Sequence, residues 1–187
     1  MLSSMVTVEG FPIPVDVAGP EKGSAVVLLG AAQHSPAAYD GVCQRLHTAS
    51  LRTIVIGPDP RLTAKGVVGI LDALDVRWGL LVGDRTGGEL AWELAATRLD
   101  KFIGLVVVDR GHPRVADPAG MIRDEHCPPV EMNTTALVSN AATRAVAKAS
   151  QRYVYGEFRL VDLLGRRNAA DSTAQLAAEI VLRTSTW

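Results

Sequence analysis

The 187-residue sequence has few cysteines, no excess charge of either sign and no long apolar run. Its two cysteines, Cys43 and Cys127, lie far apart, which excludes a disulfide scaffold and leaves two reduced thiols as the expectation. The formal net charge of -1 gives no electrostatic case for nucleic acid or an anionic membrane as a partner. No apolar segment approaches the roughly 20 residues that span a bilayer.

Targeting and metal-binding patterns are also missing. Residues 1–6 show no basic run followed by an apolar stretch, so we expect no signal peptide and a cytoplasmic protein. The cysteines do not have metal-ligand spacing, and we expect neither a metal nor a cofactor. Hydrophobic residues make up 48% and charged residues 21% of the chain, an ordinary globular balance. The length suits one domain spanning residues 1–187.

Apolar runs alternate with helical patterns along most of the chain. Strands are expected at 25–30, 53–56, 78–82, 102–109, 134–139 and 158–163, and helices at 35–48, 63–74, 87–97, 141–151 and 172–183. A hairpin of residues 6–8 and 13–17 precedes them. This alternation predicts an α/β fold, a doubly wound and mostly parallel sheet of about eight strands without a cap domain. Any site would lie at the carboxyl ends of the strands.

Two further features stand out against this pattern. The segment 110–133 is the one connection long enough to do more than link two elements. Trp78 and Trp92 lie on the expected strand and helix around residues 80–96, and we expect both to pack in the core.

Residues 80–96 are the most informative part of the sequence. They predict a buried strand, a turn bracketed by Gly83 and by Gly87 and Gly88, and a helix. This is the frame of a nucleophile elbow, in which a strained strand-to-helix turn exposes a nucleophilic side chain. The central residue is Arg85, and a guanidinium has no lone pair with which to attack a substrate.

Through this elbow and the order of its strands, the chain resembles the α/β-hydrolase fold superfamily over nearly its whole length, as a capless member with a degenerate elbow. The resemblance implies a nucleophile at Arg85, an oxyanion loop at residues 29–33, an acid near Asn140 and a histidine within residues 165–170. The oxyanion loop lacks its usual histidine, Asn140 carries no negative charge, and no histidine follows His126. Because a triad works as a unit, the three missing members argue against hydrolysis.

An active hydrolase of esters, haloalkanes or epoxides is the competing interpretation. Asp84 would be its nucleophile, as in the related aspartate-using dehalogenases and epoxide hydrolases, although two residues rather than one separate Asp84 from the glycine pair. Alternatively, Asp109 and His112 would activate a water molecule at the end of their strand. The simpler interpretation of Asp109 and His112 is that they hydrogen-bond within a loop.

The leading interpretation is a binding or interaction module whose cleft takes a small anionic ligand at Arg85. Pairing of Arg85 with a carboxylate such as Asp84 or Asp109 is the structural alternative, and it is favoured because buried charges are usually paired. A homo-oligomer and a regulatory or scaffolding subunit of an active homologue remain open. The predicted binding residues are Gly30, Ala31, His34, Asp84, Arg85, Thr86, His112 and Asn140.

Overall fold

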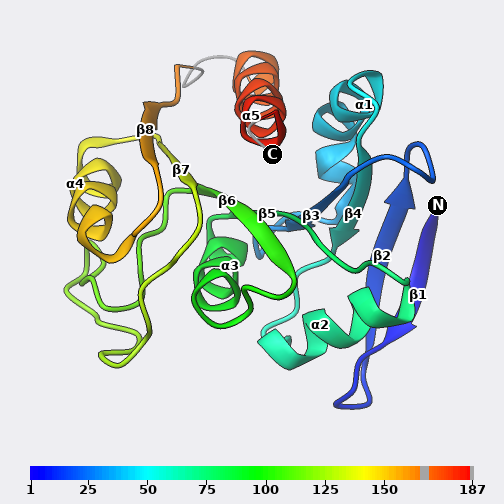
Figure 1. Ribbon diagram of the computed structural model, residues 1–187, viewed down its shortest axis with the longest axis horizontal. Coiled ribbons are helices and arrows are strands. Elements are labelled where there is room, and N and C mark those ends of the chain that lie inside the picture. The colour runs from blue at the N-terminus through cyan, green and yellow to red at the C-terminus, as the bar shows by residue number, and fades with distance from the viewer. Residues whose placement is uncertain (165–168, 186–187) are drawn as a thin grey trace.

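The computed structural model describes residues 1–164 and 169–185, in which eight strands form one sheet (Figure 1). The strands are β1 (Leu2–Val6), β2 (Pro12–Ala18), β3 (Ala25–Leu29), β4 (Arg52–Ile56), β5 (Gly79–Asp84), β6 (Phe102–Val108), β7 (Thr134–Val138) and β8 (Phe158–Asp162). Their order across the sheet is β1-β2-β4-β3-β5-β6-β7-β8. Strand β2 is antiparallel to both β1 and β4, and every later pairing is parallel. The expected mostly parallel α/β sheet is confirmed.

Within the described part of the chain, five α-helices cover the two faces of this sheet. They are α1 (Asp40–Thr48), α2 (Ala64–Ala73), α3 (Thr86–Thr97), α4 (Ala141–Ser150) and α5 (Ala169–Thr184), with short 3-10 turns at Pro36–Tyr39 and Gln151–Tyr153. Helices α1 and α5 lie together on one face, and α2, α3 and α4 lie on the other (Figure 1). Strands β3, β5 and β7 are buried along their whole length, because helices cover them on both sides.

The opening hairpin differs from its expected position. Its first strand is Leu2–Val6 rather than residues 6–8, and Val8 lies in the turn with 58% of its surface exposed. Gly10, with φ of 93°, makes the turn possible and fixes the pairing of Val6 with Pro12. The alternating apolar residues continue through the turn, so the sequence pattern could not locate the end of the strand.

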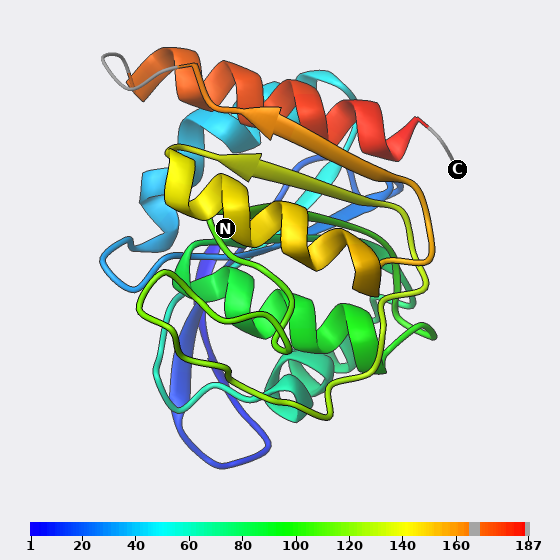
Figure 2. The same cartoon turned by 90° about the vertical axis from the view of Figure 1, so that its left-hand side faces the viewer.

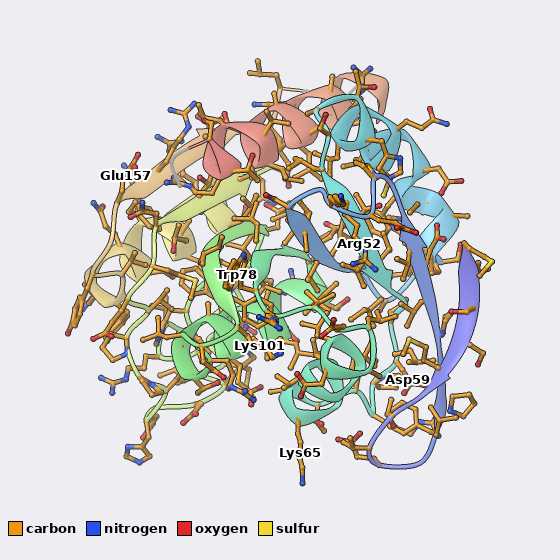
Figure 3. All side chains as sticks on the ribbon, turned by 45° about the vertical axis from the view of Figure 1, so that its right-hand side comes forward. Arg52, Asp59, Lys65, Trp78, Lys101 and Glu157 are labelled. Atoms are coloured by element: carbon orange, nitrogen blue, oxygen red, sulfur yellow. The ribbon has the colours of Figure 1, made fainter. Side chains whose placement is uncertain are left out.

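Two other expectations were wrong in detail. The helix expected at 35–48 is divided into a 3-10 turn at Pro36–Tyr39 and α1, with Tyr39 at the junction. Trp78 precedes β5 and is 60% exposed (Figure 3), whereas Trp92 on α3 is fully buried as expected.

No helix within residues 1–164 and 169–185 is long and apolar enough to cross a membrane.

The segment 109–133 between β6 and β7 contains no helix, and it is tied to the body of the fold. The indole N–H of Trp92 donates to the carbonyl of Arg110 at 3.1 Å. Glu89 on α3 pairs with Arg110 at 3.2 Å and with Arg123 at 3.7 Å. The segment therefore runs beside α3, as Figure 2 shows in yellow-green.

Candidate functional site

The turn between β5 and α3 is a single residue, Arg85. Its φ of 48° and ψ of -108° lie in a region that costs a residue with a side chain about 1–3 kcal/mol. The backbone N–H of Arg85 donates to the carbonyl of Val108 at 3.0 Å, and its carbonyl accepts from Gly88 at 2.8 Å. The chain thus makes the sharp strand-to-helix turn expected from the sequence.

Close packing explains the glycines around this turn. A Cβ on Gly83 would lie 2.6 Å from the Cβ of Ala91, and one on Gly87 would lie 2.1 Å from the carbonyl oxygen of Leu29. Both distances are too short for non-bonded atoms. The first turn of α3 can approach β3 and β5 this closely only because these positions carry no side chain.

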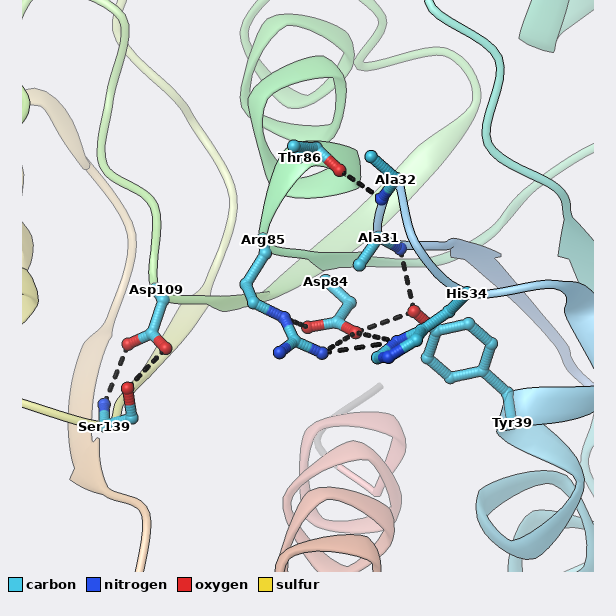
Figure 4. Close-up of polar contacts among 9 residues, drawn as sticks. All are labelled: Ala31, Ala32, His34, Tyr39, Asp84, Arg85, Thr86, Asp109 and Ser139. Atoms are coloured by element: carbon cyan, nitrogen blue, oxygen red, sulfur yellow. Dashed lines mark hydrogen bonds and ion pairs between the residues drawn. The ribbon is translucent and has the colours of Figure 1, made fainter. Parts of the chain in front are cut away.

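The guanidinium of Arg85 forms a two-pronged ion pair with the preceding residue, Asp84 (Figure 4). Its Nε lies 3.1 Å from Oδ1 and its Nη2 3.0 Å from Oδ2, and this hydrogen bonding raises the pKa of Arg85. The Asp84 side chain is 8% exposed, against 46% for Arg85. Tyr39 also donates its hydroxyl to Oδ2 of Asp84 at 2.6 Å. The predicted pairing of Arg85 with Asp84 is confirmed.

The loop after β3 uses its backbone N–H groups internally. Ala31 donates to the hydroxyl of Tyr39 at 2.8 Å, and Ala32 donates to Oγ1 of Thr86 at 2.6 Å (Figure 4). Burial, with the hydrogen bond to Asp84, raises the pKa of Tyr39, so this phenol stays neutral at pH 7. His34 lies on the same loop, with Nδ1 3.3 Å from Nη2 of Arg85.

Asp109 and His112 do not face one another. Asp109, with φ of 55°, accepts hydrogen bonds from the backbone N–H of Ser139 at 2.8 Å and from its hydroxyl at 2.6 Å (Figure 4). His112 is completely buried, and its ring stacks on Tyr153 with 4.7 Å between centroids. The alternative in which these two residues jointly activate a water molecule is not supported, because the chain turns His112 into the core after Asp109; the simpler interpretation holds for His112, whose ring hydrogen-bonds within the segment to Arg114 and Pro128.

Similarity to solved structures agrees with this arrangement of strands, helices and turn. An epoxide hydrolase from Vigna radiata is 12% identical with a TM-score of 0.75, covering 100% of this chain and 98% of that one. An esterase from Exiguobacterium antarcticum is 13% identical with a TM-score of 0.75, covering 96% and 99%. A haloalkane dehalogenase from Bradyrhizobium elkanii is 12% identical with a TM-score of 0.70, covering 100% and 99%. This chain has the α/β-hydrolase fold. No protein-family model and no curated protein sequence matches it.

In the α/β-hydrolase fold, Arg85 takes the turn position at which the resemblance implies a nucleophile. The position implied for the acid is occupied by Asn140, which is exposed and caps α4 by accepting from the backbone N–H of Thr143 at 2.8 Å. The position implied for the histidine, residues 165–170, lies largely outside the described residues. Among the residues that are described, no group of three His, Cys, Asp or Glu side chains is placed to hold a metal ion.

A groove of about 770 Å³ lies beside the elbow, between the loop that follows β4, the first turns of α3 and the segment 109–133. Gly30 and Thr86 line it, and they are the predicted binding residues that the structure brings there. The other predicted binding residues lie outside its lining: Ala31, His34, Asp84, Arg85, His112 and Asn140. The sequence marked residues 110–133 only by their length, so the groove that this segment helps to form was missed.

Strain at Arg85 can be measured by comparing two substitutions that both remove the ion pair. Glycine ordinarily costs about 0.5–1 kcal/mol relative to alanine, through the entropy of the unfolded chain. At φ of 48° the order should reverse, with Arg85→Gly more stable than Arg85→Ala by about 1 kcal/mol in chemical denaturation. An Ala variant as stable as the Gly variant would show that this turn is not strained.

The hydrogen bonds of His112 fix its protonation state. Nδ1 accepts from the backbone N–H of Arg114 at 3.2 Å, so Nε2 carries the proton and donates to the carbonyl of Pro128 at 2.8 Å. Burial lowers the pKa of His112 below 6.5, and the neutral ring has no free lone pair with which to act as a base.

This depressed pKa makes stability depend on pH. Below pH 6.5 the unfolded chain binds a proton at His112 more readily than the folded chain does, so the free energy of unfolding should fall as the pH is lowered. Denaturation measured from pH 7.5 down to about 5 should show this fall, and it should be smaller in His112→Phe. The matched control is His126→Gln, which removes an exposed imidazole and leaves His112 in place. An unaltered pH dependence in His112→Phe would contradict the assignment.

Proposed function

We propose that this chain is a ligand-binding or interaction module on the α/β-hydrolase fold, without acyl transfer at its elbow. The observation that carries the proposal is Arg85 on the strained turn, with its guanidinium paired to Asp84. A permanently protonated group at that position supplies no nucleophile. The internal use of the Ala31 and Ala32 N–H groups supports the same conclusion, because an oxyanion hole needs free donors.

The two catalytic alternatives receive less support from the geometry. As a nucleophile, Asp84 would have to attack with a carboxylate that is 8% exposed and already accepts hydrogen bonds from Tyr39 and Arg85. Water activation by Asp109 and His112 would need the two side chains to meet, but Asp109 binds Ser139 and His112 binds backbone groups. Cys127 does not supply a nucleophile in place of these residues, because burial raises the pKa of its thiol to about 11 and so disfavours the reactive thiolate.

A panel of p-nitrophenyl esters, haloalkanes and epoxides tests the absence of catalysis. Turnover should stay at the level of buffer in the wild type and in Asp84→Asn and His112→Ala, with an active esterase as the positive control. A fluorophosphonate probe followed by mass spectrometry should leave residues 84–88 unmodified. Turnover that disappears in either variant, or an adduct on the turn, would overturn the proposal.

The groove beside the elbow offers the space for a small-molecule ligand. The anionic ligand expected at Arg85 stays a prediction, and such a ligand would meet a guanidinium whose Nε and Nη2 already bind Asp84. Homo-oligomerisation and association with an active homologue also stay predictions, which size-exclusion chromatography and co-purification would test.

A further inference from the structure

Strand β1 is the last strand at one edge of the sheet, and among the described residues only β2 pairs with it (Figure 1). Two hydrogen bonds show which of its backbone groups face β2. The N–H of Thr7 donates to the carbonyl of Phe11 at 2.9 Å, and the carbonyl of Met1 accepts from Val17 at 3.1 Å. Hydrogen-bonded pairs alternate along an antiparallel ladder, so every second residue of β1 points its N–H and C=O groups outward. These residues are Leu2, Ser4 and Val6.

The prolines of β2 agree with this assignment. Pro12 lies opposite Val6, and Pro14 lies opposite Ser4. Neither proline has an N–H to donate to β1. The carbonyl of Pro14 instead accepts from the backbone N–H of Gly57 at 2.8 Å, on the β4 side of β2. Within the described part of the chain, β1 therefore presents a row of backbone donors and acceptors that the fold does not use.

The sequence of β1 does not discourage pairing at this edge. Natural edge strands are usually protected by charged side chains, proline or a bulge, and β1 has none of these. The opposite edge of the sheet, β8, carries the charged residues Arg159 and Asp162. On β1, by contrast, Leu2 is 63% exposed and Val6 is 70% exposed. Of the two edges, β1 is the one suited to strand pairing.

We propose that β1 pairs antiparallel with β1 of a second copy of this chain, joining the two sheets edge to edge. A two-fold axis at Ser4 sets Leu2 of each copy against Val6 of the other, and Ser4 against Ser4. Each facing pair can then exchange both of its N–H···O bonds, and the exposed apolar side chains cover one another. The strand is its own complement in this register, which makes a second copy the occupant. Symmetric pairing uses both edges, so the assembly closes at a dimer.

This inference is independent of the proposed function, because no residue of β1 lines the groove. A short strand buries less surface than a permanent interface does, so we expect a reversible dimer. Sedimentation velocity from about 10 μM to about 1 mM protein should show the monomer converting to a dimer as the concentration rises.

Hydrogen exchange identifies the interface within that dimer. The amides of Leu2, Ser4 and Val6 should exchange freely in dilute protein and become protected as the concentration rises. The amides of Ser3 and Met5 face β2, so their protection should change much less. This alternation along a single strand is specific to edge pairing, because a dimer formed through another surface would not produce it.

Ser4→Pro tests the outward N–H. The substitution removes this donor and places the proline ring where the second strand would lie, so it should abolish the dimer. The melting temperature of the dilute monomer should stay unchanged, because the N–H of Ser4 points away from β2. Ser4→Ala is the matched control, since it keeps the N–H and should keep the dimer.

Val6→Lys tests the edge by charge instead of by backbone. A lysine here would face Leu2 of the second copy, so it should weaken dimerisation about tenfold or more. Val8→Lys is its control, because Val8 is also exposed but lies in the turn beyond β1, and it should leave dimerisation unchanged.

Two results would overturn the inference. Protein that stays monomeric up to the highest concentration would show that this edge does not pair. A dimer that survives Ser4→Pro, or that leaves the amides of Leu2, Ser4 and Val6 unprotected, would be held by a different surface.

Discussion

Replacing Gly87 by alanine is expected to destabilise the fold by about 3 kcal/mol or more, at the upper end for overpacking. The added Cβ would lie 2.1 Å from the carbonyl oxygen of Leu29 and 2.6 Å from its carbonyl carbon. Both are backbone atoms, so no rotamer change can relieve the contact. Either α3 moves away from β3, or the end of β3 shifts together with the loop that holds Ala31 and Ala32.

Urea denaturation measures this change directly, and Gly41→Ala is the matched control. Gly41 lies in α1, where an added Cβ would approach no backbone atom and would lie 3.2 Å from the Cγ2 methyl of Thr173. Its replacement should alter stability by no more than about 1 kcal/mol, because the gain in helix propensity and this milder contact oppose one another. If Gly87→Ala matched Gly41→Ala, close packing would not be what fixes the turn at Arg85.

The same glycines explain why the elbow could be predicted from the sequence. A strand, a one-residue turn and a helix in close contact need small residues at fixed spacings. The sequence shows these residues within a short stretch, as Gly83, Gly87 and Gly88. The parallel sheet was predictable for a similar reason, because strands covered on both faces are continuously apolar. The hairpin was displaced because its apolar alternation runs on into the turn.

The interactions around the elbow could not be predicted, because they join distant parts of the chain. Tyr39 lies 45 residues from Asp84, yet its hydroxyl binds that carboxylate and the N–H of Ala31. Nothing in the sequence around His112 signals that its ring is packed between Trp92 and Tyr153. Charged and aromatic residues of this kind take their roles from partners that only the fold brings near.

Trp92→Ala is the second substitution with a large expected effect, a loss of about 4 kcal/mol. The indole is completely buried, contacts the ring of His112 edge-on with 5.7 Å between centroids, and donates its N–H to the carbonyl of Arg110. Removing it leaves a cavity under α3 and releases the start of the segment 109–133. Chemical denaturation measures the loss, and Trp78→Ala is the control. Because Trp78 is 60% exposed, its replacement should cost less than about 1 kcal/mol.

Trp92→Phe separates packing from anchoring, because it restores most of the ring but not the N–H that holds Arg110. It should recover most of the stability lost in Trp92→Ala and retain a cost of about 1 kcal/mol for the missing hydrogen bond. Hydrogen exchange at the amides of His112 and Arg114 should be faster in both variants, since these amides bind Ser150 and the His112 ring within the same cluster. Unchanged exchange would mean that Glu89, Arg110 and Arg123 hold the segment without the indole, and the groove wall would then depend on that charged network rather than on Trp92.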